Sequence, residues 1–247
     1  MLSPRYKPWH LLPFAWKYAR LRLARRPVLV HFEVTMRCNA SCGFCDYWKT
    51  PAEEKARELK SFADAARAFD PMMITFTGGE PTLRRDLEDI IAEVARATPI
   101  CYLTMITHGG MLSIERAQSL WDAGLDQVSI SLDYLDERHD AARQIPGLAA
   151  RILRTAPEMH ARGMNVRFNT VIKDDNLEDI LTWTWTVEPR ESYSGIDWEL
   201  LADPASPYAY LRFSADTLAE GVEWYFDATL VVGDGLHETD PAEPEAS

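Results

Sequence analysis

Six short runs rich in β-forming residues alternate with helical patterns along most of the chain. The helical pattern is clearest where Leu87, Ile90, Ile91 and Val94 recur at the spacing of one helix face. Strands that alternate with helices in this way build a parallel sheet with right-handed crossover connections. The order therefore predicts an α/β fold, either an open sheet covered on both faces or an incomplete barrel. The six runs are Val28–Thr35, Met72–Thr77, Ile100–Ile106, Gln127–Leu132, Asn165–Ile172 and Gly195–Leu201.

Each run has one apolar face and one polar face. In the fourth run, for example, Val128 and Ile130 alternate with Ser129 and Ser131. A sheet covered by helices on both faces needs nearly continuous apolar strands, whereas a barrel carries helices only on its outside. The pattern therefore favours a partial (β/α)6 TIM-like barrel with a wet interior for a polar ligand. An antiparallel sheet with one solvated face is the alternative, and the helix-length connections argue against it.

Charge divides the chain of 247 residues, whose formal net charge is −12. Residues 1–29 contain seven basic residues and no acid, so the rest of the chain carries a formal charge of −19. The last fifteen residues contain five acids, two prolines and no base, a composition typical of disorder. We therefore expect a basic aromatic N-terminal arm at 1–27, a core barrel at 28–230 and a disordered acidic tail at 231–247.

The arm contains an expected helix from about Phe14 to Arg25. A basic, aromatic helix of this kind could lie on an anionic membrane surface, but we favour packing across its own acidic domain. No apolar run reaches the roughly 18 residues that a membrane span needs, and the acidic net charge argues against a dedicated nucleic-acid binder. Four cysteines in a chain this long do not make a disulfide scaffold. The expected location is the cytoplasm.

Three of the four cysteines fall within eight residues, at Cys38, Cys42 and Cys45, just beyond the first run. The active-site loops of a parallel barrel gather at this end of the strands. Three thiolates can hold a metal or an iron–sulfur cluster, whereas a structural zinc site normally takes four protein ligands. Cys101 has the helix-facing parity of the third run, so we interpret it as core. A four-iron cluster on three cysteines would leave one iron open to a cofactor or substrate.

The spacing Cys-x3-Cys-x2-Cys, with Phe44 before the last cysteine, resembles the motif of the radical S-adenosylmethionine (radical SAM) superfamily. The sequence Thr77-Gly-Gly-Glu-Pro81, at the end of the second run, resembles a second motif of the same superfamily. The resemblance extends from about Val28 to Leu201 and is strongest to the molybdenum-cofactor-biosynthesis and peptide-modifying subgroup. The chain lacks the C-terminal auxiliary cluster of that subgroup, because no cysteine follows Cys101.

This resemblance implies a [4Fe–4S] cluster and S-adenosylmethionine (SAM) as cofactors. Cys38, Cys42 and Cys45 would ligate the cluster, and the methionine part of SAM would chelate the fourth iron. The same resemblance implies which residues contact SAM. They are Phe44 beside the adenine, Gly78, Gly79 and Glu80 at the methionine amino group through their backbone, Ser131 near the ribose or carboxylate, and Leu201 beside the adenine.

Substrate residues are also suggested by the resemblance. His31 and Thr75 stand where the GTP-cyclising members have arginines, which disfavours GTP as the substrate. Arg167 stands at the position of a substrate-contacting lysine, so it is a candidate for an anionic group of the substrate. It could equally form a salt bridge to an acid of the sixth run. The candidate substrate residues are Arg167, Glu33, Asp197 and Glu199.

Together these features predict a radical SAM enzyme that reductively cleaves SAM at its cluster. The 5′-deoxyadenosyl radical would abstract hydrogen from a polar small-molecule or peptide substrate. A flavodoxin or ferredoxin would supply the electron. The alternatives are a non-catalytic iron–sulfur or SAM-binding partner subunit, a shortened relative of such an enzyme, and a structural zinc site.

Overall fold

The computed structural model of the chain describes Tyr6, residues 8–49, 59–171 and 175–176, and the backbone of three strands beyond residue 195. The chain divides into two compact units, Met1–Asn169 and Thr170–Ser247. This boundary falls inside the segment 28–230 that the sequence suggests as one core. The limits of the arm and the tail stay predictions, and the tail beyond Val231 lies outside the described residues.

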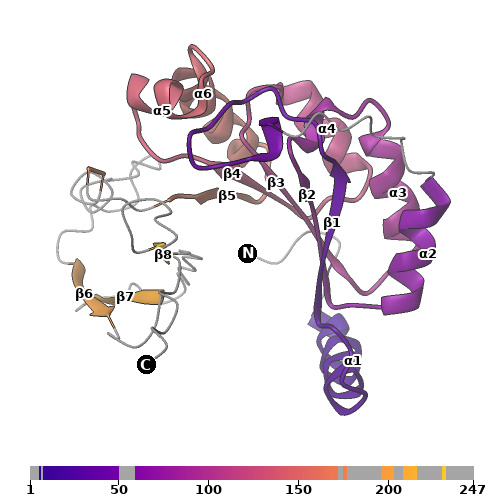
Figure 1. The fold of residues 1–247 in the computed structure, drawn as a ribbon. Coiled ribbons are helices and arrows are strands. Elements are labelled where there is room, and N and C mark those ends of the chain that lie inside the picture. Colours follow the sequence, from indigo (N-terminus) through magenta and orange to yellow (C-terminus); the bar gives the residue numbers. More distant parts are fainter. Residues whose placement is uncertain are drawn as a thin grey trace, which may run out of the picture. The chain divides into compact units, whose positions relative to one another are not determined.

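The first unit contains a five-stranded parallel sheet (Figure 1). Its strands follow one another in chain order across the sheet, and each pairs in parallel with the next. The strands are β1 (Leu29–Thr35), β2 (Met73–Gly78), β3 (Tyr102–Thr107), β4 (Gln127–Ser131) and β5 (Val166–Asn169). Five of the six predicted strands and their parallel pairing are therefore confirmed, and the unit has the expected α/β fold.

Helices connect these strands and form one layer against the sheet (Figure 1). The layer is continuous, because α2 packs on α3, α3 on α4 and α4 on α6. Ser113 caps the start of α4, since its Oγ accepts a hydrogen bond from Arg116 N at 3.2 Å. The helices are α1 (Leu11–Leu23), α2 (Leu59–Phe69), α3 (Leu87–Ala97), α4 (Ile114–Asp122), α5 (Glu137–Arg143) and α6 (Leu148–Ala161). Short 3-10 helices are η1 (Pro8–His10), η2 (Tyr47–Lys49) and η3 (Pro81–Leu83).

The core lies between the sheet and this helical layer. Its strand residues all have the parity that the sequence assigns to the apolar face, and the helix residues recur at the predicted spacing. Each such side chain contributes about 1.5–3 kcal/mol when it is fully buried. Fully buried members include Ile74, Phe76, Leu103 and Met105 from the strands and Ile90, Ile91, Val94 and Leu120 from the helices.

The opposite face of the sheet carries a continuous row of polar side chains, as predicted. The parallel register places His31 beside Thr75, Thr75 beside Thr104, and Thr104 beside Gln127. Gln127 Nε2 donates to Thr104 Oγ1 within this row at 3.4 Å and to Ser129 Oγ farther along β4 at 3.0 Å. This polar face carries the surface on which we expect a polar substrate.

The sixth predicted strand is present, but its predicted parallel pairing is wrong. In the second unit, β6 (Ile196–Ala202) pairs antiparallel with β7 (Tyr208–Ala215), which pairs antiparallel with β8 (Leu230–Val231). The alternating pattern of β6 specifies two unlike faces, which an antiparallel strand also has. The pattern therefore predicts the strand but not its partner. Only five residues separate β6 from β7, a connection typical of a hairpin rather than of a crossover.

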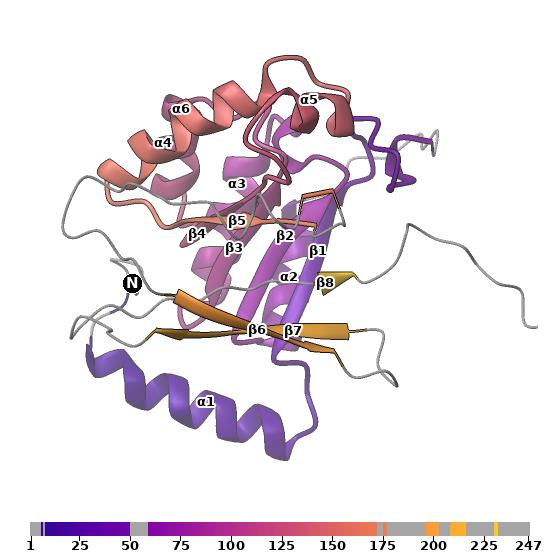
Figure 2. The same cartoon turned by 90° about the vertical axis from the view of Figure 1, so that its left-hand side faces the viewer.

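The N-terminal arm forms the predicted helix and packs against its own unit. Helix α1 lies at the end of the sheet where the strands begin (Figures 1 and 2). Lys17 is buried, and its Nζ lies 2.8 Å from Asp70 Oδ1 just before β2. Tyr6 Oη donates to Asp126 Oδ2 at 3.3 Å just before β4. This helix therefore packs across its own acidic domain, which is the interpretation that we favour from the sequence.

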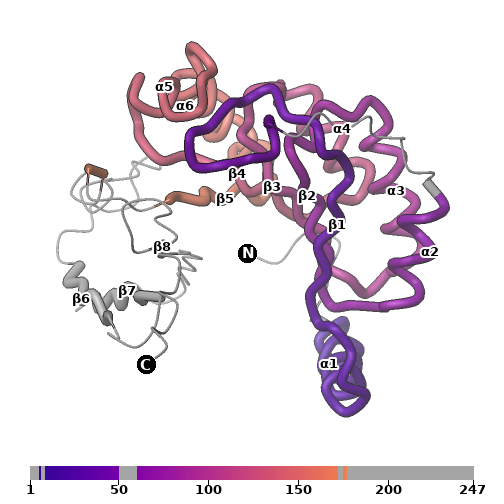
Figure 3. The backbone as a smooth tube through the Cα atoms, viewed as in Figure 1, coloured from indigo at the N-terminus to yellow at the C-terminus, as the bar shows by residue number. Residues whose placement is uncertain are grey.

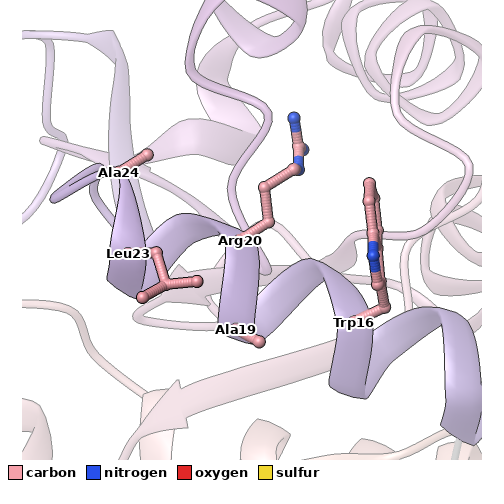
Figure 4. Close-up of a pocket in the computed structure, with 5 residues that line it drawn as sticks. All are labelled: Trp16, Ala19, Arg20, Leu23 and Ala24. Atoms are coloured by element: carbon pink, nitrogen blue, oxygen red, sulfur yellow. The ribbon is translucent and has the colours of Figure 1, made fainter.

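The other side of α1 is apolar and exposed. Trp16 is 68% exposed and Leu23 is 87% exposed, and both line a shallow pocket with Arg20 (Figure 4). Contact with an anionic membrane surface would use this side of the arm, and such contact stays a prediction. Within the described parts of the chain, no helix has the length and apolar character required to cross a bilayer.

We expect Asp70→Asn to lower the free energy of unfolding by about 1–2 kcal/mol near neutral pH. Hydrogen bonds to charged groups are worth about 1.5–3 kcal/mol, and partial exposure of the Asp70 side chain weakens its pairs with Lys17 and Arg20. Chemical denaturation of the full chain measures the change. Asp64→Asn is the matched control, because it removes an exposed pair with Arg67 and should cost less than about 0.5 kcal/mol.

The difference between the wild type and Asp70→Asn should also depend on pH. Burial raises the pKa of the Asp70 carboxyl, but the hydrogen bonds and charges of Lys17 and Arg20 outweigh it and hold the pKa below its ordinary value. The stabilisation is therefore present above the ordinary pKa of about 3.9 and is lost as the pH falls through the folded-state pKa. A difference that stayed constant through that acid range would contradict the ion-pair explanation.

Candidate functional site

The three clustered cysteines lie on the loop that follows β1, at the carboxyl end of the parallel sheet. We call residues 36–46 the cysteine loop. Cys38 and Cys45 are half-buried, Cys42 is buried, and all three are free thiols. Figure 3 shows the loop leaving the end of β1 and running toward α5. The structure therefore confirms the predicted location of the cysteines beside the strand ends.

The glycine pair at the end of β2 holds the start of this loop. Gly79 N donates to Thr35 O at 2.9 Å, and Glu80 N donates to Arg37 O at 2.8 Å. A Cβ atom on Gly78, whose φ is +132°, would lie 2.0 Å from Thr35 O, and one on Gly79 would lie 2.3 Å from Arg37 O. Both positions need glycine because the two backbones pass too close for any side chain.

The side chain of Glu80 connects the ends of β2 and β3 through hydrogen bonds. Its carboxylate is fully buried. It accepts hydrogen bonds from Thr82 N at 3.0 Å, Thr107 Oγ1 at 2.7 Å and His108 N at 2.9 Å, and also from Thr82 Oγ1. A buried carboxylate is tolerated only when such donors surround it. The predicted SAM contact at Glu80 is thereby limited to its backbone, because its side chain is engaged inside the protein.

His108, just beyond β3, connects this buried carboxylate to the cysteine loop. Its Nδ1 accepts from Gly110 N at 2.9 Å, so its Nε2 carries the proton and donates to Asn39 Oδ1 at 2.9 Å. Burial lowers the pKa of His108, although the charge of Glu80 raises it, and the ring is therefore neutral near pH 7. The sequence pattern does not predict this role, because Asn39 and His108 are far apart along the chain.

Arg143, at the end of α5, approaches the loop from the β4 side. Its Nε and Nη2 lie 3.1 and 2.7 Å from Asp133 Oδ2, and its guanidinium carbon lies 5.0 Å from the centre of the Phe44 ring. The positive charge of Arg143 lowers the pKa of the Cys42 thiol and so partly offsets the effect of burial, and Arg143 O accepts from Ser41 N at 3.3 Å. The loop is thus held by residues that follow β2, β3 and β4.

The three thiols form one electrostatic group. Burial raises the pKa of the Cys38 thiol, and the charges of Glu80, Cys42 and Cys45 raise it further. Burial also raises the pKa of Cys42, and the positive charge of Arg143 partly offsets this. Such thiolates repel one another, and a cationic iron–sulfur group would relieve the repulsion. The donor set therefore fits an iron–sulfur cluster. Among the described side chains, no three from His, Cys, Asp and Glu converge on a site for a single metal ion.

Two aromatic residues that follow the cysteines, Tyr47 and Trp48, form hydrogen bonds with β1 and with the cysteine loop. Trp48 Nε1 donates to Cys42 O at 2.9 Å. Tyr47 Oη donates to Glu33 Oε1 at 2.6 Å, and this hydrogen bond is the main reason why the pKa of Tyr47 is raised to about 12. The carboxylate of Glu33, a candidate substrate residue, is thereby paired with a tyrosine of the same chain.

Two further predicted residues lie on β4 and β5 of the first unit. Ser131 ends β4, is half-buried and lies beside Asn169 of β5. Arg167 lies one row lower, beside Ser129. Ser131 is therefore at the same edge of the sheet as the cysteine loop, whereas Arg167 belongs to the polar face of the strands.

The remaining predicted residues lie in the second unit, on β6. Asp197, Glu199 and Leu201 belong to the antiparallel sheet, where Glu199 is opposite Arg212 of β7. Their side chains lie outside the described part of the chain. Their roles stay predictions.

Comparison with known protein families gives a match to the radical SAM superfamily over residues 32–183. This segment contains the cysteine loop and the residues that hold it. The fold agrees with solved structures. SuiB of Streptococcus suis bound to precursor peptide SuiA has a TM-score of 0.55 and 20% identity, covering 71% of this chain and 41% of that one. The protein anSMEcpe with bound AdoMet and a peptide has a TM-score of 0.51 and 20% identity, covering 62% and 45%.

Curated relatives carry the names of different enzymes. An AdoMet-dependent heme synthase of Nitratidesulfovibrio vulgaris is 29% identical over 208 residues, covering 81% of this chain and 55% of the relative. A probable GTP 3′,8-cyclase of Thermoplasma volcanium is 32% identical over 201 residues, covering 76% and 59%. A GTP 3′,8-cyclase of Mycobacterium ulcerans is 39% identical over 132 residues, covering 49% and 35%. The chain thus spans about a third to three fifths of the length of these relatives.

The family match covers more than half of the chain and includes each residue that holds the cysteine loop. This chain belongs to the radical SAM superfamily of enzymes, and its cofactors are a [4Fe–4S] cluster and S-adenosylmethionine.

Proposed function

We propose that Cys38, Cys42 and Cys45 ligate the [4Fe–4S] cluster and that the chain initiates radical chemistry on a polar small-molecule or peptide substrate. The observation that carries this proposal is that three free thiols lie on one short loop, which follows β1 at the carboxyl edge of the sheet. When bound, the cluster supplies the electron that cleaves SAM, and the 5′-deoxyadenosyl radical abstracts a substrate hydrogen.

The task of this chain is to present the loop in one conformation beside the strand ends. The amide groups of Gly79 and Glu80 are used to hold the loop. A contact from this segment to the methionine amino group would therefore use carbonyl oxygens, which are the acceptors that an ammonium group needs. Phe44, Ser131 and Leu201 remain proposed contacts to the rest of SAM.

The substrate is expected on the polar face of the sheet below the cluster. Tyr102 Oη accepts from Asn165 Nδ2 at 2.6 Å and donates to Gln127 Oε1 at 3.2 Å, so this face already binds polar groups through fixed partners. His31 and Thr75 lie side by side there and bring no guanidinium, which supports a substrate other than GTP. Arg167 is our candidate for an anionic substrate group, with Glu33, Asp197 and Glu199 as further candidates.

An external one-electron donor is required, and we propose a flavodoxin or ferredoxin. The chain keeps four free cysteines in its described residues, which suits a reducing compartment such as the cytoplasm. A non-catalytic cluster-binding subunit would have the same iron content. Experiments must therefore measure binding of the cofactors separately from cleavage of SAM.

We expect alanine at Cys38, Cys42 or Cys45 to abolish cluster formation. After anaerobic reconstitution, the wild type should contain about four iron and four sulfide per chain, the content of a [4Fe–4S] cluster. The single variants should lose most of both. Cys101→Ala is the matched control, because Cys101 is fully buried away from the loop and its variant should load as the wild type does. Zinc without iron in the wild type would sink the cluster assignment.

Reduction of the loaded wild type with SAM present should release 5′-deoxyadenosine. A fully loaded cluster that binds SAM but never yields this product, even with a flavodoxin or ferredoxin supplied, would favour the non-catalytic subunit. Once cleavage is established, candidate substrates carrying deuterium can be screened. Transfer of deuterium into 5′-deoxyadenosine identifies the substrate from which hydrogen is abstracted.

We expect Gly79→Ala to reduce iron loading several-fold, because its Cβ would lie 2.3 Å from Arg37 O and displace the start of the cysteine loop. Gly43→Ala is the matched control within the same loop, since nothing lies within 4 Å of its added Cβ. Iron content after reconstitution, together with circular dichroism to confirm folding, measures both. Equal loading of the two variants would show that the glycine pair is not needed for the loop conformation.

A further inference from the structure

Arg143 contacts the cysteine loop both through its backbone carbonyl group and through its guanidinium. Its carbonyl oxygen accepts from Ser41 N, and any residue at this position could supply that bond. Its guanidinium, in addition, lies over the Phe44 ring at 5.0 Å, and its positive charge acts on the Cys42 thiol. The loop thus has a positive charge fixed beside one of its three sulfur atoms.

The position of this charge is determined by a buried acid. Asp133 is fully buried, and its Oδ2 accepts from Nη2 of Arg143 at 2.7 Å and from Nε at 3.1 Å. His139 does not compete for the acid as a cation. Its Nδ1 accepts from Asp133 N at 3.2 Å, and burial, followed by the charge of Arg143, lowers the pKa of His139 to about 4. Arg143 is therefore the cation that pairs with Asp133, at 2.7 Å.

We propose that Arg143 is a positioning residue that makes the bound cluster easier to reduce, and that Asp133 both orients Arg143 and moderates its effect. This inference rests on the proposed function, because it assumes that Cys42 ligates the cluster. It adds a residue outside the two sequence motifs to the groups that control the electron-transfer step.

The physical argument follows from charge. Reduction transfers one electron from an external one-electron reductant to the cluster, which with its thiolates becomes one unit more negative. No bond breaks in that step. A positive charge beside a cluster sulfur stabilises the reduced form more than the oxidised form, and hydrogen bonds to cluster sulfur act in the same direction. A negative charge nearby, such as that of Asp133, has the opposite effect.

Removal of the charge tests the proposal in the full-length, reconstituted protein. At one fixed potential, we expect Arg143→Gln to hold about a tenfold smaller ratio of reduced to oxidised cluster than the wild type, equivalent to about 59 mV for a one-electron couple. Arg143→Lys keeps the charge and should lie between the two. Redox titration with mediators, followed by the electron paramagnetic resonance signal of the reduced cluster, measures this ratio without any turnover.

The chain offers a closely matched control on the same helix. Arg138 also lies over an aromatic ring, 4.9 Å from the centre of Tyr134, and pairs with an aspartate, Asp136, at 2.8 Å. It is exposed. Arg138→Gln should therefore leave the ratio unchanged. A shift as large as that of Arg143→Gln would overturn the proposal, because it would show a general effect of net charge.

Asp133→Asn separates an electrostatic role from a merely structural one. If Arg143 acts through its charge, removal of its counter-charge should increase the reduced fraction, opposite in sign to Arg143→Gln. If Arg143 only supports the loop, both variants should weaken cluster loading and leave the ratio of the loaded fraction unchanged, which overturns the proposal. Should Asp133→Asn fail to fold, the comparison of Arg143→Gln with Arg143→Lys decides alone. A wild type that forms no cluster would instead refute the proposed function.

Discussion

A single buried carboxylate, that of Glu80, holds together the edge of the sheet on which the site is built. It has no contact with water, so its charge must be stabilised by donors from the protein. Those donors come from η3 and from the end of β3, and His108 passes the connection on to Asn39 of the cysteine loop. Charge-assisted hydrogen bonds of this kind are about twice as strong as neutral ones. The loop is therefore coupled to two strand ends through one side chain.

The opposite side of the loop is supported by a different balance of charges. Asp133 and Arg143 form a pair that is removed from water, and such a pair adds little net stability because its desolvation is costly. Its value lies in where it holds the guanidinium, against Cys42 and Phe44. The neutral His139 beside the pair leaves the charge of Asp133 available to Arg143. Asp133 and Arg143 therefore add little to stability, and their proposed role lies in the position of the guanidinium.

Sequence patterns predicted the first five strands, their faces and the site of the cysteines, because these follow from local periodicity and spacing. They could not predict that β6 pairs with β7, since alternation defines the faces of a strand and leaves its partner open. The aromatic residues of Tyr208–Ala215 are typical of a strand, but they do not identify it as the partner of β6. The roles of His108 and Arg143 were missed for a different reason. Each depends on a contact with the loop that exists only after separate strand ends come together.

The family match includes the residues around the cysteine loop and does not include the strands of the second sheet. The match over residues 32–183 contains the cysteine loop, the glycine pair, Glu80, His108 and Arg143. The strands β6 to β8 lie beyond it. Relatives with different reaction names match this chain over 132 to 208 residues. We therefore expect substrate specificity to come from the polar face of the sheet and from parts of the protein outside the matched segment. On that face, the pairing of Glu33 with Tyr47 and the placement of Arg167 beside Ser129 leave the chain with a different charge pattern from a row of arginines. We therefore expect the proposed polar substrate to meet both donor and acceptor groups on that face.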